Sequence, residues 1–196
     1  MASDFSTLPA DLPVPVDDGA CDHLVGMRVP DIPLPSTAGR SVVLAKTGRP
    51  RTVVYVYPRT GEPDKPSPPG WDAIPGARGC TPQSCGFRDH HRELLDLGAE
   101  VFGLSAQTTA YQQEMVERLH LPFEVLSDAD LRFAWALRLP TFEVAGEDGI
   151  MTLIKRLTLV LRAGRIEHVF YPVFPPDRSA ADTIAWLRAH PLPPSG

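Results

Sequence analysis

The sequence has few of the features that mark membrane-spanning, nucleic-acid-binding or secreted proteins. No apolar run approaches the ~18 residues of a transmembrane helix. Acidic residues outnumber basic residues by 24 to 19, and the net charge of -5 argues against nucleic acid or an anionic membrane as a partner. The first 20 residues contain no Lys or Arg and no continuous apolar segment, so we expect no secretory signal.

Cysteine is equally scarce. Three cysteines, an odd number, do not make a disulfide framework. Without a secretory signal, the expected compartment is the reducing cytoplasm, where disulfides are rare unless they are transient and catalytic. Cys80 and Cys85 lie five positions apart, whereas Cys21 is remote from both in sequence. The count therefore fits one redox-active pair and one bystander.

Proline, by contrast, is plentiful, with 22 residues. Residues 1–21 are rich in Pro and Asp, which predicts a poorly ordered N-terminal arm that lies on the surface. Residues 22–193 are long enough for one domain with a substantial core. Within that domain, residues 59–79 are dominated by Pro and Gly and have no helical or strand period. We expect a long loop there, and such loops are usually functional or disordered.

The hydrophobic patterns downstream predict alternating strands and helices. The expected strands are Val53–Tyr57, Glu100–Ala106, Phe123–Leu126, Leu153–Leu161 and Ile166–Phe170, and the expected helices are Cys80–Leu97, Thr108–Leu119, Leu131–Leu139 and Ser179–His190. The helices are long enough to cover both faces of a sheet. This order indicates an α/β three-layer sandwich.

The cysteine pair stands where the long loop turns into a helix. Cys80 follows Gly79, and Pro82 suits a first helical turn because its missing N–H costs nothing there. The unpaired N–H groups and the positive dipole end of a helix start stabilise a thiolate over a thiol. A second thiol within reach captures the oxidised form of the first. Cys80 and Cys85 are therefore candidates for an attacking and a resolving thiol.

The spacing of the pair limits what it can do. On an intact helix, residues five positions apart have Cα atoms roughly 8.7 Å apart, whereas a disulfide needs less than about 7 Å. Cys80 and Cys85 cannot bond until the first turn unwinds. Two buried structural cysteines remain an alternative. A zinc site with His90 is disfavoured, because steps of about 140° spread the three side chains around the helix.

Several short motifs resemble a known family. Tyr57-Pro58, the segment GCTPQSCGFRD at 79–89, Gly103-Leu104-Ser105 and Leu126-Ser127-Asp128 together resemble peroxiredoxins of the AhpC/TSA superfamily, with most similarity to the bacterioferritin-comigratory-protein/PrxQ group. The resemblance covers about residues 29–187. It implies a thioredoxin-like fold with a central mixed β-sheet and an N-terminal extension, and a possible homodimer.

The same resemblance implies a function. A peroxiredoxin reduces hydrogen peroxide or organic hydroperoxides without a cofactor. By position, Cys80 is then the peroxidatic residue that becomes a sulfenic acid, and Cys85 condenses with it. A thioredoxin-like protein reduces the resulting disulfide.

The sequence departs from the family pattern before the first cysteine. Ala73 and Ala77 stand where the family has Pro and Thr or Ser, so residues 59–79 look like an insertion into that motif. Thr60, directly after Tyr57-Pro58-Arg59, is the candidate for the missing hydroxyl if the insertion loops out and returns. Trp71 within the loop is either a lid or partner contact, or an anchor for its own loop.

The family also uses an arginine beside the peroxidatic cysteine. Arg156 precedes a strand-like segment that ends at a Gly turn, as in the family, and is the preferred candidate. Arg138 matches only locally and is the alternative. A guanidinium suits the role because it stays charged and donates in a planar fork.

Two other functions fit the same fold. One is a non-catalytic redox sensor or metallochaperone. Copper-delivery proteins of this fold use Cys-x-x-x-Cys with a distal His, for which His168 is the candidate, but the spacing here is one residue longer. A general thiol–disulfide reductase normally uses Cys-x-x-Cys and is disfavoured on the same ground.

Overall fold

The central element is a five-stranded mixed sheet. The computed structural model describes residues 8–9, 11–63, 65–146 and 149–193. The strand order is β5-β4-β3-β8-β9, in which β3 pairs in parallel with β4 and antiparallel with β8, β4 pairs in parallel with β5, and β8 pairs antiparallel with β9. These strands are β3 (Arg51–Val56), β4 (Ala99–Ser105), β5 (Val125–Ser127), β8 (Leu157–Arg162) and β9 (Arg165–Phe170).

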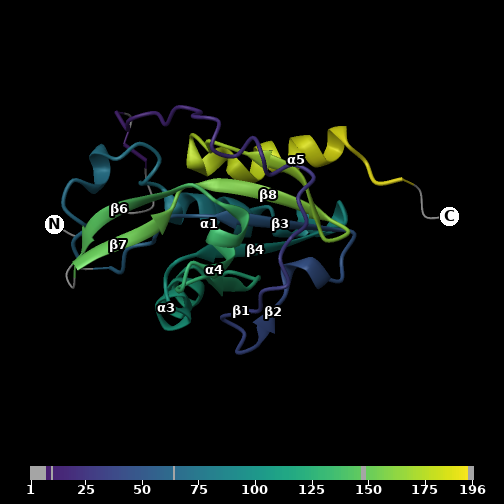
Figure 1. The fold of residues 1–196 in the computed structure, drawn as a ribbon, viewed down its shortest axis with the longest axis horizontal. Coiled ribbons are helices and arrows are strands. Elements are labelled where there is room, and N and C mark those ends of the chain that lie inside the picture. The colour runs from purple at the N-terminus through teal and green to yellow at the C-terminus, as the bar shows by residue number, and fades with distance from the viewer. Residues whose placement is uncertain (1–7, 10, 64, 147–148, 194–196) are drawn as a thin grey trace.

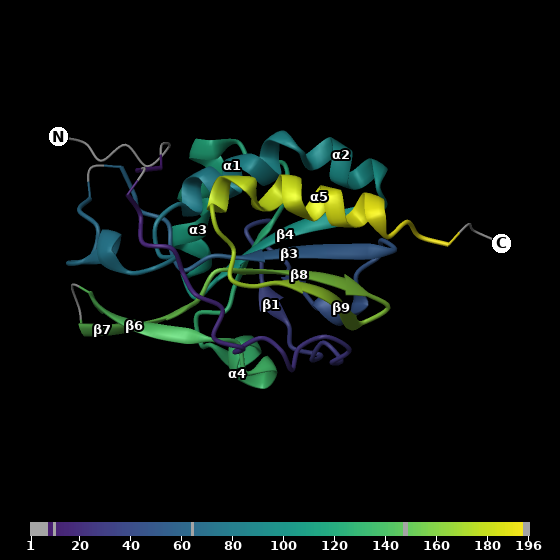
Figure 2. The ribbon, with the colours of Figure 1, turned by 90° about the horizontal axis from the view of Figure 1, so that it is seen from above.

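Helices and extended chain cover the two faces of this sheet, which confirms the three-layer arrangement (Figure 2). One face packs against α1 (Cys80–Asp89), α2 (His91–Asp96), α3 (Thr109–Leu119) and α5 (Ser179–Ala189). The other face packs against α4 (Arg132–Leu137) and the chain from Cys21 to Leu44. All residues of β3 are buried, because the strand is covered on both faces and has no side that faces water. This explains the continuous apolar run at Val53–Tyr57.

An aromatic stack fixes α1 on the sheet. The ring of Tyr55 lies 4.5 Å from the ring of Phe87 at an interplanar angle of 10°. Its hydroxyl donates to Ser84 Oγ at 3.2 Å. A Cβ on Gly103 would lie 2.8 Å from the Tyr55 hydroxyl oxygen, so the neighbouring strand must have glycine at this point. Packing and a hydrogen bond thus hold the helix that begins with Cys80 against β3.

Two expected elements are divided in the structure. The helix expected over Cys80–Leu97 is two helices, separated at His90, which has φ -99° and ψ 7°. The strand expected over Leu153–Leu161 belongs to two sheets: β7 (Gly149–Ile154) pairs with β6 (Thr141–Gly146), and β8 starts only after Lys155 and Arg156. Only the second part of that strand, as β8, forms a hairpin with β9, and another hairpin, β6–β7, precedes it. Two short strands, β1 (Leu34–Pro35) and β2 (Ser41–Val42), form a separate pair.

The Pro/Gly-rich loop packs on the β6–β7 hairpin. Trp71, in the short 3₁₀ helix η2 (Trp71–Ala73), is buried with Val144 and Leu153 in a small cluster of its own. Its ring lies 6.3 Å from that of Phe142. Trp71 therefore anchors its own loop. In Figures 1 and 2 the β6–β7 hairpin lies at one end of the molecule, and the C-terminus lies at the other.

The described part of the N-terminal arm follows the surface above β8, where it is drawn in purple in Figure 1. Asp18 in this arm pairs with Lys155, with 2.9 Å between its Oδ2 and the lysine Nζ. It also accepts a hydrogen bond of 2.8 Å from the Tyr171 hydroxyl. In the described ranges, no helix is both long enough and apolar enough to cross a bilayer.

Candidate active site

Cys80 is the first residue of α1 and its side chain is 4% exposed. The residue before it, Gly79, has φ 100° and ψ 19°, a left-handed conformation that favours glycine. A Cβ there would also lie 2.3 Å from Pro176 Cγ, closer than packing allows. The sharp turn at Gly79 thus brings Cys80 from the loop directly onto the start of the helix.

The guanidinium of Arg156 lies beside the sulfur of Cys80. Its Nη2 donates to Cys80 Sγ at 3.1 Å, and the residue is 3% exposed. The guanidinium also donates to the backbone: Nε bonds to Gly76 O at 3.2 Å, and Nη2 bonds to Ala77 O at 3.0 Å and Arg78 O at 3.1 Å as well. Three successive carbonyls of the chain before Cys80 therefore hold this charge in place.

The other candidate arginine is elsewhere. Arg138 ends α4 as its C-cap with φ 51°, and it is exposed. Of the two arginines considered from sequence, the structure brings only Arg156 to Cys80. A buried guanidinium and the first turn of a ten-residue helix both favour negative charge on that sulfur.

A side chain that the sequence did not single out completes the contacts of this arginine. Gln83 Oε1 accepts a short hydrogen bond from Arg156 Nη1, and Gln83 Nε2 donates to Ser179 Oγ at 3.3 Å. Ser179 Oγ also lies 3.1 Å from Thr158 Oγ1. Gln83 is fully buried on α1, three residues after Cys80, so the helix that carries the thiol also holds the arginine. In the sequence, the position of Gln83 in the first turn of the expected helix, three residues after Cys80, could have indicated a residue of the site.

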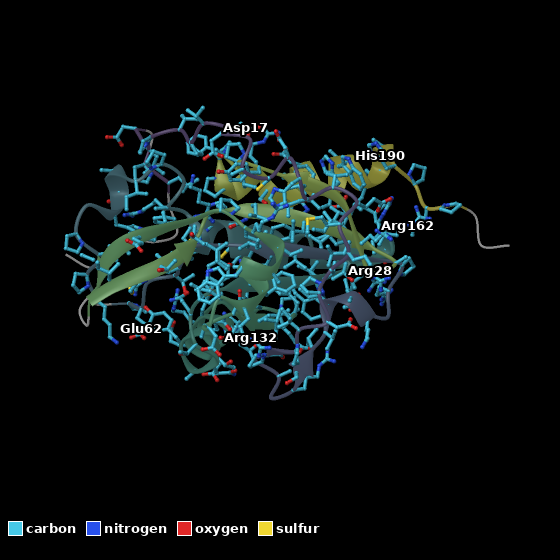
Figure 3. All side chains as sticks on the ribbon, viewed as in Figure 1. Asp17, Arg28, Glu62, Arg132, Arg162 and His190 are labelled. Atoms are coloured by element: carbon cyan, nitrogen blue, oxygen red, sulfur yellow. The ribbon has the colours of Figure 1, made fainter. Side chains whose placement is uncertain are left out.

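A small cavity of about 30 Å³ opens at Cys80. Thr81 and Tyr111 line it, together with loop residues on both sides of Trp71. Arg59 is one of these loop residues, and its Nη2 donates to the Tyr111 hydroxyl at 3.2 Å. The Pro/Gly-rich loop therefore forms one wall of the space above the thiol. Glu62 of this wall lies at the hairpin end of the molecule, remote from Arg162 and His190 (Figure 3).

Thr60, the candidate hydroxyl donor, is buried beside this cavity but is not part of its lining. Its hydroxyl donates to Gln107 Oε1 at 3.3 Å, and its backbone N–H donates to the same oxygen at 2.9 Å. Gln107 Nε2 returns a bond to Thr60 O at 3.1 Å. The structure pairs Thr60 with Gln107, so a contact of its hydroxyl with a peroxide stays a prediction. Thr81, next to the thiol, is one of the hydroxyl-bearing residues that line the cavity.

Cys85 is half-buried on the second turn of α1, and both thiols of the pair are free. Burial raises the pKa of the Cys85 thiol, although the charge of Arg88 partly opposes this effect. Cys85 is therefore held as a neutral thiol near pH 7. This environment suits a resolving thiol, which condenses with a sulfenic acid, better than the thiol that attacks the peroxide.

Cys21 and the histidines lie outside this site. Cys21 is buried in the core cluster on the opposite face of the sheet. His168, the candidate distal ligand, stacks on Trp186 with 4.6 Å between ring centroids. His90 pairs with Glu93 at 3.1 Å. Among the residues that the structure describes, no group of three or more His, Cys, Asp or Glu could hold a metal ion.

Comparisons with known proteins show the family to which the chain belongs. A family model described as Redoxin matches residues 24–184. The chain therefore belongs to the redoxin family. Within that family, it is a peroxiredoxin of the Q/Bcp group, as the following relatives show.

The curated relatives carry peroxiredoxin names. The chain is 31% identical over 170 residues to "Peroxiredoxin Bcp" of Escherichia coli, with 84% of this chain and 96% of that protein covered. It is 32% identical over 168 residues to "Peroxiredoxin Q, chloroplastic" of Oryza sativa subsp. japonica, with 84% of this chain and 66% of that protein covered. The chain thus spans slightly less than two thirds of the length of the chloroplast relatives from rice and, at 64%, wheat.

Solved structures share the fold. Peroxidoxin BcpB from Mycobacterium tuberculosis superimposes with a TM-score of 0.65 at 26% identity, over 85% of this chain and 98% of that one. Peroxiredoxin Q from Xanthomonas campestris gives 0.63 at 21% identity, over 92% and 99%. The central mixed sheet and its helices are therefore those of a thioredoxin-like peroxiredoxin.

Proposed function

We propose that this protein is a thiol-dependent peroxidase, with Cys80 as the peroxidatic residue. The observation that carries the proposal is the 3.1 Å contact from Arg156 Nη2 to Cys80 Sγ at the start of α1. A fixed guanidinium stabilises the thiolate and can also donate to a peroxide oxygen as charge develops on it. The activity resides in the domain at 22–193, to which residues 1–21 are an N-terminal extension.

In the first step, the Cys80 thiolate attacks one oxygen of a hydroperoxide ROOH. The S–O bond forms as the O–O bond breaks, and the leaving RO⁻ takes a proton and departs as water or an alcohol. The sulfur is oxidised to a sulfenic acid and the peroxide is reduced. Arg156 is suited to stabilise both the thiolate and the charge that moves to the leaving oxygen.

In the second step, the Cys85 thiol attacks the sulfenic sulfur and water leaves, which produces a Cys80–Cys85 disulfide. On the intact α1 the two Cα atoms lie roughly 8.7 Å apart, beyond the reach of about 7 Å for a disulfide. The first turn must therefore unwind in each cycle. A thioredoxin-like dithiol then reduces the disulfide by thiol–disulfide exchange and is itself oxidised.

The cavity at Cys80 favours a small substrate. A volume of about 10–15 Å³ holds one water molecule, so a cavity of about 30 Å³ accommodates roughly two oxygen atoms. A volume of this size favours hydrogen peroxide over a larger hydroperoxide. A bulkier organic hydroperoxide must extend into the neighbouring cavity of about 490 Å³ between the loop and β6–β7, which shares Arg59 and Tyr111 with it.

The proposal is tested by hydrogen peroxide consumption coupled to oxidation of reduced thioredoxin. Cys80→Ser should abolish consumption, whereas Cys21→Ser should leave it unchanged. Mass spectrometry of wild-type protein after one equivalent of peroxide should find an intramolecular Cys80–Cys85 bridge. Full activity of Cys80→Ser rejects the assignment of the attacking thiol. Exclusively intermolecular bridges, or bridges to Cys21, reject the role of Cys85.

A further inference from the structure

The N-terminal arm lies against the four residues that lead into Cys80. A Cβ on Gly79 would lie 2.8 Å from Leu8 Cδ2, and a Cβ on Gly76 would lie 3.5 Å from Pro15 Cγ. These distances place the two arm side chains in contact with the segment 76–79. The same segment supplies the three carbonyls that hold Arg156. The arm therefore covers the part of the chain that positions both the thiol and the arginine.

One acidic side chain fastens this arm. Asp18 binds Lys155 Nζ at 2.9 Å and the Tyr171 hydroxyl at 2.8 Å, and Lys155 directly precedes Arg156 in sequence. These hydrogen bonds lower the pKa of Asp18 to about 2, so it is ionised at any physiological pH. A cavity of about 360 Å³ lies beneath the arm, lined by Val14, Pro15 and Asp18 on one side and by Arg156 on another. The described part of the arm thus spans a cavity and is held at its two sides by these contacts.

The covered segment has to move if the cysteines are to bond. Gly79 O accepts the first helical hydrogen bond, from Gln83 N at 3.0 Å, and this bond breaks when the first turn unwinds. Displacement of Gly79 also separates it from Leu8. The contact of Leu8 with Gly79 exists only while the turn is folded, so it adds to the free energy needed to unwind that turn. The bonds of Asp18 to Lys155 and Tyr171 hold the arm in the position where this contact forms.

We propose that the N-terminal arm is a strap, fastened by Asp18, that slows the unwinding of the first turn of α1 and so slows disulfide formation. This inference rests on the proposed function. The strap acts after the reaction with peroxide, because that reaction takes place in the folded site. It lengthens the lifetime of the Cys80 sulfenic acid.

A longer-lived sulfenic acid has a chemical consequence. It either condenses with Cys85 and releases water, or it reacts with a second hydroperoxide. In the second reaction the sulfur gains another oxygen to become a sulfinic acid and the peroxide leaves as water or an alcohol. The strap therefore shifts the balance towards overoxidation at high peroxide concentration.

The test uses full-length protein in a single turnover with one equivalent of hydrogen peroxide, followed by quenching and mass spectrometry. Asp18→Ala should raise the rate of Cys80–Cys85 disulfide formation roughly two- to fivefold, the effect of losing an exposed ion pair. Asp17→Ala is the matched control, because Asp17, labelled in the arm in Figure 3, accepts a hydrogen bond of 3.0 Å from Gly19 N within the arm and has no ion pair with another described residue. The preceding rate of Cys80 oxidation should be the same in all three proteins.

A second variant removes the packing contacts and leaves the ion pair. Leu8→Ala combined with Pro15→Ala should also accelerate disulfide formation. In both this variant and Asp18→Ala, the hydrogen peroxide concentration that converts half of Cys80 to the sulfinic acid should be higher than in the wild-type protein. Unchanged disulfide formation in both variants, or equal acceleration by Asp17→Ala, overturns the strap. Absence of sulfenic acid at Cys80 in the wild-type protein would instead reject the proposed function, so the two failures are distinct.

Discussion

The guanidinium of Arg156 lies 3.1 Å from the sulfur of Cys80, although 76 positions separate the two residues in the chain. The approach follows from the sheet: Arg156 directly precedes β8, which pairs with β3 at the centre. Three backbone carbonyls and Gln83 share the arginine with the sulfur. The charge is thereby held in one place before any substrate arrives.

The first prediction concerns this arginine. Arg156→Lys should lower the second-order rate constant of Cys80 oxidation by about 10²-fold, because an ammonium cannot reproduce a planar fork of donors. Stopped-flow measurement with hydrogen peroxide checks this. Arg138→Lys, at the exposed end of α4, should leave the rate constant unchanged. A larger loss of rate in Arg138→Lys than in Arg156→Lys would show that Arg156 is not the arginine that assists Cys80.

Thr60 provides a second prediction. Because its hydroxyl bonds to Gln107, Thr60→Val should lower the free energy of unfolding by about 1 kcal/mol, and the rate constant of Cys80 oxidation should fall only if the same hydroxyl also contacts the peroxide. Urea denaturation and stopped-flow kinetics measure the two effects separately, and Thr60→Ser serves as the control that keeps the hydroxyl. A large loss of rate in Thr60→Val, restored in Thr60→Ser, would show instead that the hydroxyl acts on the peroxide.

A third prediction concerns the bystander thiol. Burial, with a smaller contribution from the charge of Asp18, raises the pKa of Cys21 to about 12. At neutral pH its thiolate fraction is then about a thousandfold below that of an ordinary thiol. Maleimide should modify the half-buried Cys85 in the native protein well before Cys21, which should react only on unfolding. Rapid native labelling at Cys21, located by mass spectrometry against a Cys21→Ser control, would contradict this.

The fourth prediction is a pH dependence of stability. Burial lowers the pKa of His91 and of His168, and the charge of His190 contributes at His168. The unfolded chain therefore binds protons that the folded chain does not, and the free energy of unfolding should fall as pH drops below about 6.5. Urea denaturation at pH 7.5 and 5.5 tests this. The difference should shrink in a double variant, His91→Gln with His168→Gln, and an undiminished difference would contradict the assignment.

Much of the fold and the position of the thiols could be predicted from local patterns. Gly79 and Pro82 mark a helix start, and the apolar residues Phe87 and Leu94 mark the buried faces of α1 and α2. The β6–β7 hairpin was missed, because β6 is mostly exposed or half-buried and lacks a clear alternation. Because β6 was not predicted as the partner of β7, the end of β7 and most of β8 were predicted as one strand.

The site was only partly predictable for a related reason. The choice of Arg156 followed from the strand and Gly turn after it, which are local features. The pairing of Thr60 with Gln107, and the contact of Gln83 with Arg156, join side chains 47 and 73 positions apart. No local period encodes such contacts, because they depend on how α1 and the loop pack on the sheet.

The sequence by itself determined the chemistry that the thiol pair can perform. Five positions on a helix are a property of the chain alone, so the need to unwind α1 before a disulfide forms follows without tertiary structure. Only the tertiary structure decided what surrounds that helix start. It brought Arg156 to the sulfur and laid Leu8 and Pro15 over the segment that must move. These contacts arise from sheet order and from the path of the arm, which are set by packing between distant segments.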